Sequence, residues 1–288
     1  MSLEASELIL NSDGSIYHLN LLPEDLAETV IVVGDPDRVG MVSKYFDLVQ
    51  VKKGKREFIT HTGILNGKRV SVVSTGIGSD NIDIVFNELD ALVNIDLKTR
   101  TIKQQHKALD IVRIGTSGGI QPDIAVDSFL LSQSGVGFDG LLHFYDGKKD
   151  ENQTLCEALT KHLKWHGKNI VPYVFDNSAV LAKKLISNRI RFGVTVTNAG
   201  FYGPQGRQLR LNPSLLDFHE KLLGFRMGEL QITNLEMETA AIYGLAKLLG
   251  HHAVSMNAIL ANRATGEFSK DPTKTVDALI QYCLERLT

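Results

Sequence analysis

The chain has 288 residues, of which 43% are hydrophobic and 22% charged, and its formal net charge is -2. This composition is typical of a globular protein with one large core, and the near-neutral charge gives no reason to expect nucleic acid or an acidic membrane as a partner. No apolar run approaches the ~20 residues that span a bilayer, and the start, with Glu4 and Glu7, lacks the basic and apolar pattern of a targeting signal. The two cysteines, Cys156 and Cys283, form no metal or redox motif. We therefore expect a cytoplasmic protein that acts on small molecules.

The first part of the chain predicts an arm, a strand and an anion-facing turn. Residues 1–28 look like an irregular N-terminal arm that either packs locally or reaches a neighbouring subunit. Residues 29–33 form an apolar run typical of a buried strand, and Gly34-Asp35-Pro36-Asp37-Arg38 follows it. Asp35 and Pro36 suit the start of a helix, whose free N–H groups would point, together with Arg38, toward an anion.

A hairpin and a glycine turn come next. Residues 58–65 and 69–74 alternate as strands around the turn Asn66-Gly67. The basic cluster over 52–58 includes Arg56 and, taken alone, indicates only a solvated face. The turn after the second strand, Gly76-Ile77-Gly78, opens a helix over about 82–93, but Asn81 stands where a dinucleotide fingerprint needs its third glycine, so we expect no NAD-type cofactor. Residues 94–109 look like an exposed, partly helical surface insertion.

Residues 110–120 carry one arginine in an otherwise apolar strand and then break into a Gly/Thr/Ser loop. Ligands of open α/β sheets lie just beyond the carboxyl ends of such strands. Arg113 would then point toward the ligand, and Thr116 and Ser117 with nearby N–H groups would form an anion nest. The alternative is that Arg113 pairs with a buried carboxylate while the glycines turn the chain.

The second half predicts a strand over 128–132, a loop over 133–149, helices over 152–166 and 178–187, and a strand over 192–197. The loop that follows holds Phe201, Gln205 and Arg207. Glutamine and arginine together satisfy the donor and acceptor edges of a planar heterocycle, and an aromatic ring supplies a stacking face. The alternative is a polar surface loop that its aromatic side chains anchor.

The C-terminal region predicts a helix from residue 233 to 250, in which Thr233 and Glu236 fit a capping box. Glu238 then has no local role and is suited to accept hydrogen bonds from the hydroxyls of a ligand. A strand over 253–261, a possible lid over 264–270 and a last helix that begins at Asp271-Pro272 complete the chain. Without an HExxH pattern or paired cysteines, we expect no metal site.

Six motifs occur in the order found in the nucleoside phosphorylase family: Gly34-Asp35-Pro36-Asp37-Arg38, Arg56-Glu57-Phe58, Ser74-Thr75-Gly76-Ile77-Gly78, Arg113-Ile114-Gly115-Thr116-Ser117-Gly118-Gly119, Phe201 with Gln205 and Arg207, and Glu236-Met237-Glu238. The chain resembles this family from about Tyr17 to the C-terminus, and most closely its uridine-specific members. The resemblance implies a single α/β domain over residues 1–288, with a mixed central β-sheet flanked by helices.

The resemblance also implies a role for each motif. The phosphate-binding residues would be Gly34, Arg38, Arg56, Arg113 and Thr116. The ribose-binding residues would be Tyr17, His18, Thr116, Met237 and Glu238, and the base-binding residues Phe201, Gln205 and Arg207. Catalysis would rest on Arg113, Glu238, Arg207 and Gln205. Arg56, Tyr17 and His18 would come from the partner subunit of a homo-oligomer.

The implied reaction is the reversible phosphorolysis of uridine to uracil and ribose 1-phosphate, with inorganic phosphate as a substrate and no cofactor. Two alternatives remain: a phosphorylase of another nucleoside, purine or deoxypyrimidine, and a non-catalytic nucleoside-binding protein. The purine-specific relatives resemble one another in an acidic residue after the strand that corresponds to 253–261, where this chain has Asn262-Arg263. Relatives that bind a monovalent cation between subunits have serine at the position of Asn81, so we do not expect that ion.

Overall fold

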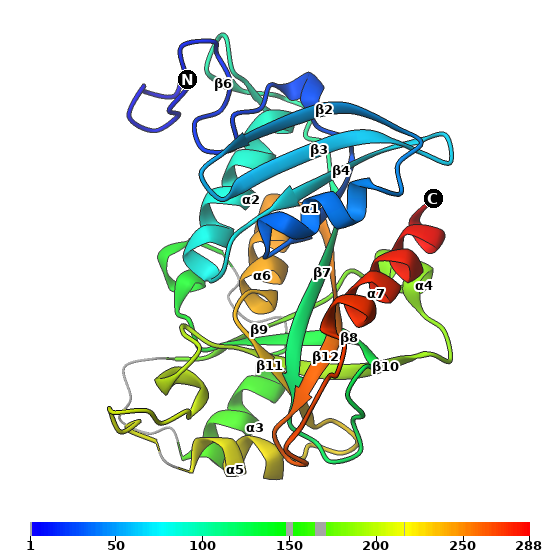
Figure 1. The fold of residues 1–288 in the computed structure, drawn as a ribbon. Coiled ribbons are helices and arrows are strands. Elements are labelled where there is room, and N and C mark those ends of the chain that lie inside the picture. The colour runs from blue at the N-terminus through cyan, green and yellow to red at the C-terminus, as the bar shows by residue number, and fades with distance from the viewer. Residues whose placement is uncertain (1, 148–151, 165–170, 216) are drawn as a thin grey trace.

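The computed structural model describes every residue except 1, 148–151, 165–170 and 216, and its described part is organised by one mixed sheet (Figure 1). In spatial order the strands are β13 (Glu267–Phe268), β12 (His252–Asn262), β8 (Phe129–Gly137), β10 (Ile190–Thr197), β11 (Ile232–Glu236), β7 (Asp110–Gly119), β1 (Thr29–Val33), β4 (Lys68–Ser74), β3 (Phe58–Leu65) and β2 (Leu48–Lys55). A further strand, β9 (Tyr173–Asp176), pairs with β8. This mixed sheet confirms the predicted fold class.

Five of these strands close into a ring. Strand β12 pairs with β7 as well as with β8, so the ladder runs from β7 through β12, β8, β10 and β11 and returns to β7. Within the ring β7 is parallel to β12, and β10 is parallel to both β8 and β11. The first two strands meet the other three through two antiparallel pairs, β7 with β11 and β12 with β8. Strand β7 also continues the open part of the sheet through its parallel pairing with β1.

Helices cover the sheet in separate groups (Figure 1). The described helices are α1 (Pro36–Ser43), α2 (Ser79–Asn94), α3 (Gln153–Leu163), α4 (Ala179–Leu185), α5 (Phe218–Gly224), α6 (Thr239–Leu249) and α7 (Pro272–Leu287), with short 3₁₀ helices η1 (Pro23–Asp25), η2 (Leu141–Phe144) and η3 (Gly203–Gln205). Strand β1 shows how two cores arise: Val30 and Val32 pack with α2 and α6, whereas Ile31 and Val33 pack with α1 and α7. This alternation follows from the two-residue period of a strand.

The N-terminal arm and the segment over 94–109 pack against each other. That segment forms a two-stranded hairpin, β5 (Ile95–Asp96) with β6 (Thr101–Ile102), so the expectation of partial helix there was wrong. Ser2 forms a β-bridge to Thr101, and Nε of Arg100 donates to the carbonyl of Leu3 at 3.2 Å. The hairpin therefore holds the start of the chain.

Two further expectations were wrong. Residues 133–149 were expected as a loop, but β8 continues to Gly137 and η2 follows it, while residues 148 and 149 lie outside the described part. The predicted helix from residue 233 is the strand β11 up to Glu236, and α6 begins only at Thr239. The parallel pairing with β10 makes these residues a strand, which local propensity does not reveal. The expected helix over 152–166 is α3, whose described part ends at Leu163; residues 165 and 166 are not described.

The strand β2, the strand β9 and the helix α5 had no counterpart among the predicted elements. Within the described residues, no helix combines the length and the apolar character that crossing a bilayer requires.

Gly135 in β8 lets the start of α6 approach the sheet. A Cβ at this position would lie 2.8 Å from Cα and 3.0 Å from the backbone nitrogen of Ala240. We predict that Gly135→Ala lowers the free energy of unfolding by about 1–3 kcal/mol, because backbone must move to relieve the overlap. Urea denaturation of the two proteins measures the difference.

Gly40→Ala is the matched control, because Gly40 lies in α1 and a Cβ there meets no atom within 4 Å. This change should stabilise the protein by roughly 0.5–1 kcal/mol through helix propensity. If Gly135→Ala were as harmless as Gly40→Ala, the close approach of α6 to β8 would not constrain this position.

Candidate active site

A cavity of about 850 Å³ lies where the loops after several central strands meet. The predicted site residues that line it are Gly34, Arg38, Arg113, Thr116, Phe201, Gln205, Arg207, Met237 and Glu238. They follow or belong to β1, β7, β10 and β11, which are neighbours in the sheet in the order β10, β11, β7, β1. Residues far apart in the sequence therefore meet in one cavity, at strand ends as expected for a sheet of this type.

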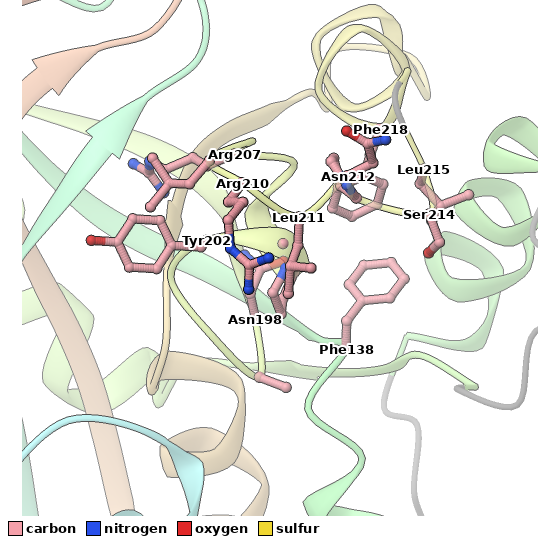
Figure 2. A pocket seen from close by; sticks show the side chains of 15 residues that line it. Phe138, Asn198, Tyr202, Arg207, Arg210, Leu211, Asn212, Ser214, Leu215 and Phe218 are labelled. Atoms are coloured by element: carbon pink, nitrogen blue, oxygen red, sulfur yellow. The ribbon is translucent and has the colours of Figure 1, made fainter.

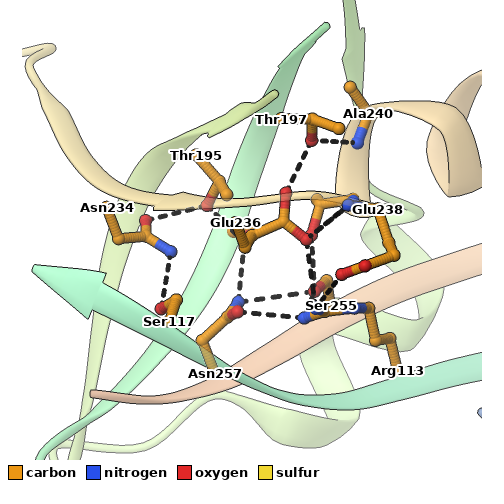
Figure 3. Close-up of polar contacts among 12 residues, drawn as sticks. Arg113, Ser117, Thr195, Thr197, Asn234, Glu236, Glu238, Ala240, Ser255 and Asn257 are labelled. Carbon is orange, nitrogen blue, oxygen red and sulfur yellow. Dashed lines mark hydrogen bonds and ion pairs between the residues drawn. The ribbon is translucent and has the colours of Figure 1, made fainter. Parts of the chain in front are cut away.

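Arg113 is the central charge of this cavity, and it is buried (Figure 3). Its Nη2 lies 2.7 Å from Oε2 of Glu238 and 3.1 Å from Oε2 of Glu236. Its Nη1 donates to Oδ1 of Asn257 at 3.0 Å and to Ser255 at 3.3 Å. Burial lowers the pKa of Arg113, but the two carboxylates outweigh burial and raise it. Arg113 thus pairs with buried carboxylates and lines the cavity at the same time, so the two sequence interpretations are compatible.

Gly115 leaves the space that the Arg113 side chain occupies. A Cβ at residue 115 would lie 1.9 Å from Nη1 of Arg113. Gly115 lies on the same face of β7 as Arg113, two residues later. A larger side chain at residue 115 would displace the guanidinium, which explains why glycine occupies this position.

Glu236 joins Arg113 to the start of α6. Its Oε2 accepts from the backbone N–H of Glu238 and of Thr239 at 3.0 and 2.8 Å, and its Oε1 accepts from the hydroxyl of Thr197 at 2.6 Å. Burial, and then the charge of Glu238, raise the pKa of Glu236, which Arg113 opposes. The capping role predicted for Glu236 therefore exists, but Glu236 caps α6 from the end of a strand and not from within a helix.

Glu238 has structural partners in addition to Arg113. Its Oε1 accepts from the backbone N–H of Gly78 at 2.8 Å. The expectation that Glu238 lacks a local role was therefore wrong, because both of its oxygens are engaged. Each carboxylate oxygen has a second lone pair, so Glu238 can still accept hydrogen bonds from ligand hydroxyls.

Polar side chains connect the strands of the ring behind Arg113 (Figure 3). Asn257 donates to Ser132 at 3.0 Å, and Ser132 lies 2.6 Å from the hydroxyl of Thr195. Thr195 donates to Asn234 at 2.9 Å, and Asn234 donates to Ser117 at 3.0 Å. All are buried. This network fixes Arg113 from behind, since buried polar groups that satisfy one another hold a single arrangement.

Arg38 adds a second cation near Arg113. Its Nη1 donates to the carbonyl of Ile114 at 3.2 Å. Burial, and then the positive charge of Arg113, lower the pKa of Arg38. Guanidinium groups nonetheless stay protonated. An anion bound between Arg38 and Arg113 would relieve their repulsion.

The base loop, residues 198–207 after β10, presents the predicted base-binding residues. The guanidinium of Arg207 lies 3.8 Å from the ring centre of Phe201, and its Nη1 donates to Oε1 of Gln205. Nη1 of Arg263 donates to the backbone carbonyl of Gln205 at 2.6 Å. Burial, and then the charge of Arg263, lower the pKa of Arg207. Arg207 therefore lines the cavity and covers one face of Phe201, while Arg263 holds the backbone of Gln205.

The three residues expected from a partner subunit do not line the cavity of their own chain. Arg56 is exposed in the turn between β2 and β3, with a left-handed φ of 56°. The backbone N–H and Nδ1 of His18 bind Glu88 in α2 at 3.0 and 2.7 Å. Tyr17 lies under the ammonium of Lys55, 3.7 Å from its ring centre. Their separation from the cavity is compatible with the expected exchange between subunits.

The family model described as the phosphorylase superfamily matches residues 28–287. The chain belongs to the phosphorylase superfamily. It is 30% identical to a uridine phosphorylase of Thermococcus kodakarensis, over 90% of this chain and 81% of the relative. It is also 30% identical to a uridine phosphorylase of Haemophilus influenzae, over 90% of each chain.

A solved structure has the same fold. A Trypanosoma brucei nucleoside phosphorylase, described as showing uridine phosphorylase activity, aligns with a TM-score of 0.85 and 25% identity over 97% of this chain and 98% of that one. The family and the fold expected from the motifs are thus confirmed. Among the described residues of this phosphorylase-superfamily chain, no three His, Cys, Asp or Glu side chains cluster in a way that could hold a metal ion.

Sequence reasoning missed two residues of the site. Glu236 was assigned only to a helix cap, although it pairs with Arg113. Arg263 was noted only as occupying the place of an acid, although it binds the base loop. The proximity of Glu236 to Glu238 in the sequence was a usable signal, because two buried acids require a buried cation. No local pattern indicated the contact of Arg263 with Gln205.

We predict that Arg113→Met costs about 3–5 kcal/mol of stability at pH 8, because it leaves Glu236 and Glu238 buried without their cation. Without Arg113, burial and the charge of Glu238 hold the folded-state pKa of Glu236 above its unfolded value. Stability then falls as the pH rises through the raised pKa, and the deficit relative to wild type should shrink at pH 5. Urea denaturation of both proteins at pH 5 and pH 8 measures this deficit.

Arg38→Met is the control for this pH effect. Arg38 lines the same cavity, but its Nη1 donates to a backbone carbonyl. Its removal should cost less than about 1.5 kcal/mol, the usual upper range for one hydrogen bond, with little difference between pH 5 and pH 8. An Arg113→Met deficit that is the same at both pH values would contradict the role of the acid pair.

Proposed function

We propose that the chain is a uridine phosphorylase, a pentosyltransferase that transfers ribose between uracil and inorganic phosphate. The observation that carries the proposal is the order of the strands around the cavity. The base loop follows β10, Met237 and Glu238 follow β11, Arg113 and Thr116 belong to β7, and Gly34 and Arg38 follow β1. Base, ribose and phosphate groups would lie in this same order along a nucleoside and its attacking phosphate.

The proposed reaction follows from these charges. An oxygen of phosphate attacks the anomeric carbon while the bond from that carbon to the uracil nitrogen breaks, and its electron pair leaves with uracil. The sugar passes through an oxocarbenium-like state, which the bound phosphate stabilises. Glu238 would hold the ribose hydroxyls, and Arg38, Arg113 and Thr116 would hold phosphate. No cofactor takes part.

Gln205 and Arg207 would receive the uracil anion. Its charge spreads over two carbonyl oxygens, and the positive charges of Arg207 and Arg263 favour an anion there. The purine alternative receives no support from Asn262: its Nδ2 donates to the carbonyls of Gln121 and Ile124, and its Oδ1 accepts from backbone N–H groups of the next loop. A side chain held in this way has no proton to give to a purine ring.

We also propose that the site is completed by a partner subunit. Within one chain the charges of Arg38 and Arg113 are balanced by those of Glu236 and Glu238. A phosphate dianion needs further positive charge, which Arg56 of the partner would supply, with Tyr17 and His18 next to the ribose. A cytoplasmic location remains part of this proposal, and a chain with only two cysteines is compatible with it.

The direct test follows the absorbance change of uracil release from uridine, with and without phosphate. We predict turnover only with phosphate, preference for uridine over inosine and adenosine, and at least a hundredfold loss of kcat/KM in Arg113→Ala. A charged hydrogen bond is worth roughly 1.5–3 kcal/mol and each ~1.4 kcal/mol is a factor of ten.

Other outcomes of this assay would replace the proposal. Turnover that ignores phosphate would indicate a hydrolase, and tight uridine binding without turnover would indicate a binding protein. A preference for inosine or adenosine would make the chain a purine phosphorylase.

Mixed dimers test the shared site. Arg56→Ala and Arg113→Ala subunits carrying different tags are co-expressed, and the heterodimers are isolated. Each parent should be nearly inactive, but a heterodimer has one site with both arginines, so it should recover about half of the wild-type activity.

The matched pair for this experiment is Arg38→Ala with Arg113→Ala. Both residues line the cavity of one chain, so every site of the heterodimer keeps a defect and no activity should return. Heterodimers of Arg56→Ala and Arg113→Ala that stay as inactive as their parents would rule out the donation of Arg56 from a partner.

A further inference from the structure

A second cavity, of about 810 Å³, shares Arg207 with the first and is lined by other residues of the base loop (Figure 2). Its walls come from that loop and from the segment that continues it to residue 215. Phe138 and Phe218 form an edge-to-face pair in the lining, with ring centres 5.7 Å apart and planes at 87°. Leu211 and Leu215 add aliphatic surface. Such a lining suits a flat apolar ligand.

One buried polar atom in this lining lacks a partner. Asn198 is 1% exposed, and none of the described residues donates a hydrogen bond to its Oδ1. Its Nδ2 lies 3.5 Å from the carbonyl of Val196, at the limit of a hydrogen bond. A buried acceptor that the protein leaves unsatisfied requires an explanation, and a bound molecule with an N–H or O–H group supplies one.

The charges around this cavity favour an anion. Arg207 and Arg210 line it, and the lining residues that the structure describes include no carboxylate. Arg210 is exposed and forms part of the rim. Next to the lining residue Phe218, burial and then the charge of Arg263 lower the pKa of His219.

We propose that this second cavity binds a planar aromatic anion that carries one hydrogen-bond donor. Its rings would lie against Phe138 and Phe218, its donor would reach Asn198, and its anionic group would meet Arg210. The ligand would also weaken the binding of uracil in the first cavity, a consequence that rests on the proposed function.

Arg207 is the physical connection between the two cavities, because it lines both. In the first cavity it covers Phe201 and binds Gln205. An anion in the second cavity attracts the same guanidinium, and a guanidinium drawn there is withdrawn from uracil. By linkage, uracil must weaken the binding of the anion by the same factor.

The first test uses 8-anilinonaphthalene-1-sulfonate, which combines fused aromatic rings, an N–H donor and a sulfonate. Its fluorescence in a titration of the wild-type protein should rise and saturate with one binding site. Arg210→Ala should weaken this binding about tenfold, as expected for the loss of one charge-assisted hydrogen bond. Arg226→Ala, which removes an equal charge from an exposed residue that does not line the cavity, should leave it unchanged.

Asn198→Leu distinguishes a binding role from a structural one. The replacement removes an acceptor that has no partner among the described residues, so the urea midpoint of the free protein should stay the same or rise, while the affinity for the probe falls. A lower midpoint with unchanged probe affinity would overturn the assignment of Asn198. Probe binding that does not saturate, or that Arg210→Ala and Asn198→Leu both leave unchanged, would overturn the site.

The second test measures coupling by repeating the titration at increasing uracil. The probe's Kd should rise and then reach a plateau, because both ligands bind at once. A Kd that rises without limit would place the probe in the base site, and a constant Kd would exclude the coupling. A protein that binds the probe as described but binds no uracil would contradict the proposed function and leave the second cavity as the site of the anion.

Discussion

The pairing of one buried guanidinium with two buried carboxylates is the constraint on which the rest of the structure depends. Arg113 from β7 meets Glu236 and Glu238, which end β11 and begin the turn into α6. Charges in a protein interior are tolerated only when they are paired and hydrogen-bonded. Placing Arg113 there therefore requires the ring of strands to close with β11 beside β7, and it fixes where α6 starts.

The closed ring gives this pairing a polar support that an open sheet lacks. Asn257, Ser132, Thr195 and Asn234 come from four different strands and form one hydrogen-bonded path behind Arg113. Each step of this path joins neighbouring strands, and the step from Arg113 in β7 to Asn257 in β12 exists because these two strands pair where the ring closes. The surrounding helices supply apolar cores on the outside, so the stability of the fold and the polarity of the site occupy separate parts of the molecule.

Much of the fold was predictable from the sequence, because its strongest signals are local. Residues 29–33 and 58–65 coincide with β1 and β3, and Asp271-Pro272 marks the start of α7 as expected. The helix expected from residue 233 shows what local signals miss. Thr233 and Glu236 carry the chemistry of a helix cap, and Glu236 does cap α6, but pairing with a distant strand decides that they lie in β11.

Most of the predicted site residues line one cavity, but their contacts were not predictable. Sequence motifs selected the residues of β1, β7, β10 and β11 that line one cavity. They left open whether Arg113 pairs with a carboxylate or faces an anion, because its partners are more than a hundred residues away in the chain. The structure shows that the first does not exclude the second.

The pairing of Arg113 with two carboxylates limits how an anion can bind. The terminal nitrogens of Arg113 are already engaged by Glu236, Glu238, Asn257 and Ser255, so Arg113 can share its charge with phosphate but cannot give it up. Arg38 makes fewer contacts and is repelled by Arg113, so it is the more available of the two arginines for binding an anion.

A site built in this way holds its geometry before the ligand arrives, and it attracts a dianion strongly only when further positive charge reaches it. The exposed Arg56, which does not line the cavity of its own chain, is where a second subunit would bring that charge. Binding of phosphate and association of subunits would therefore support each other, because each supplies what the other lacks.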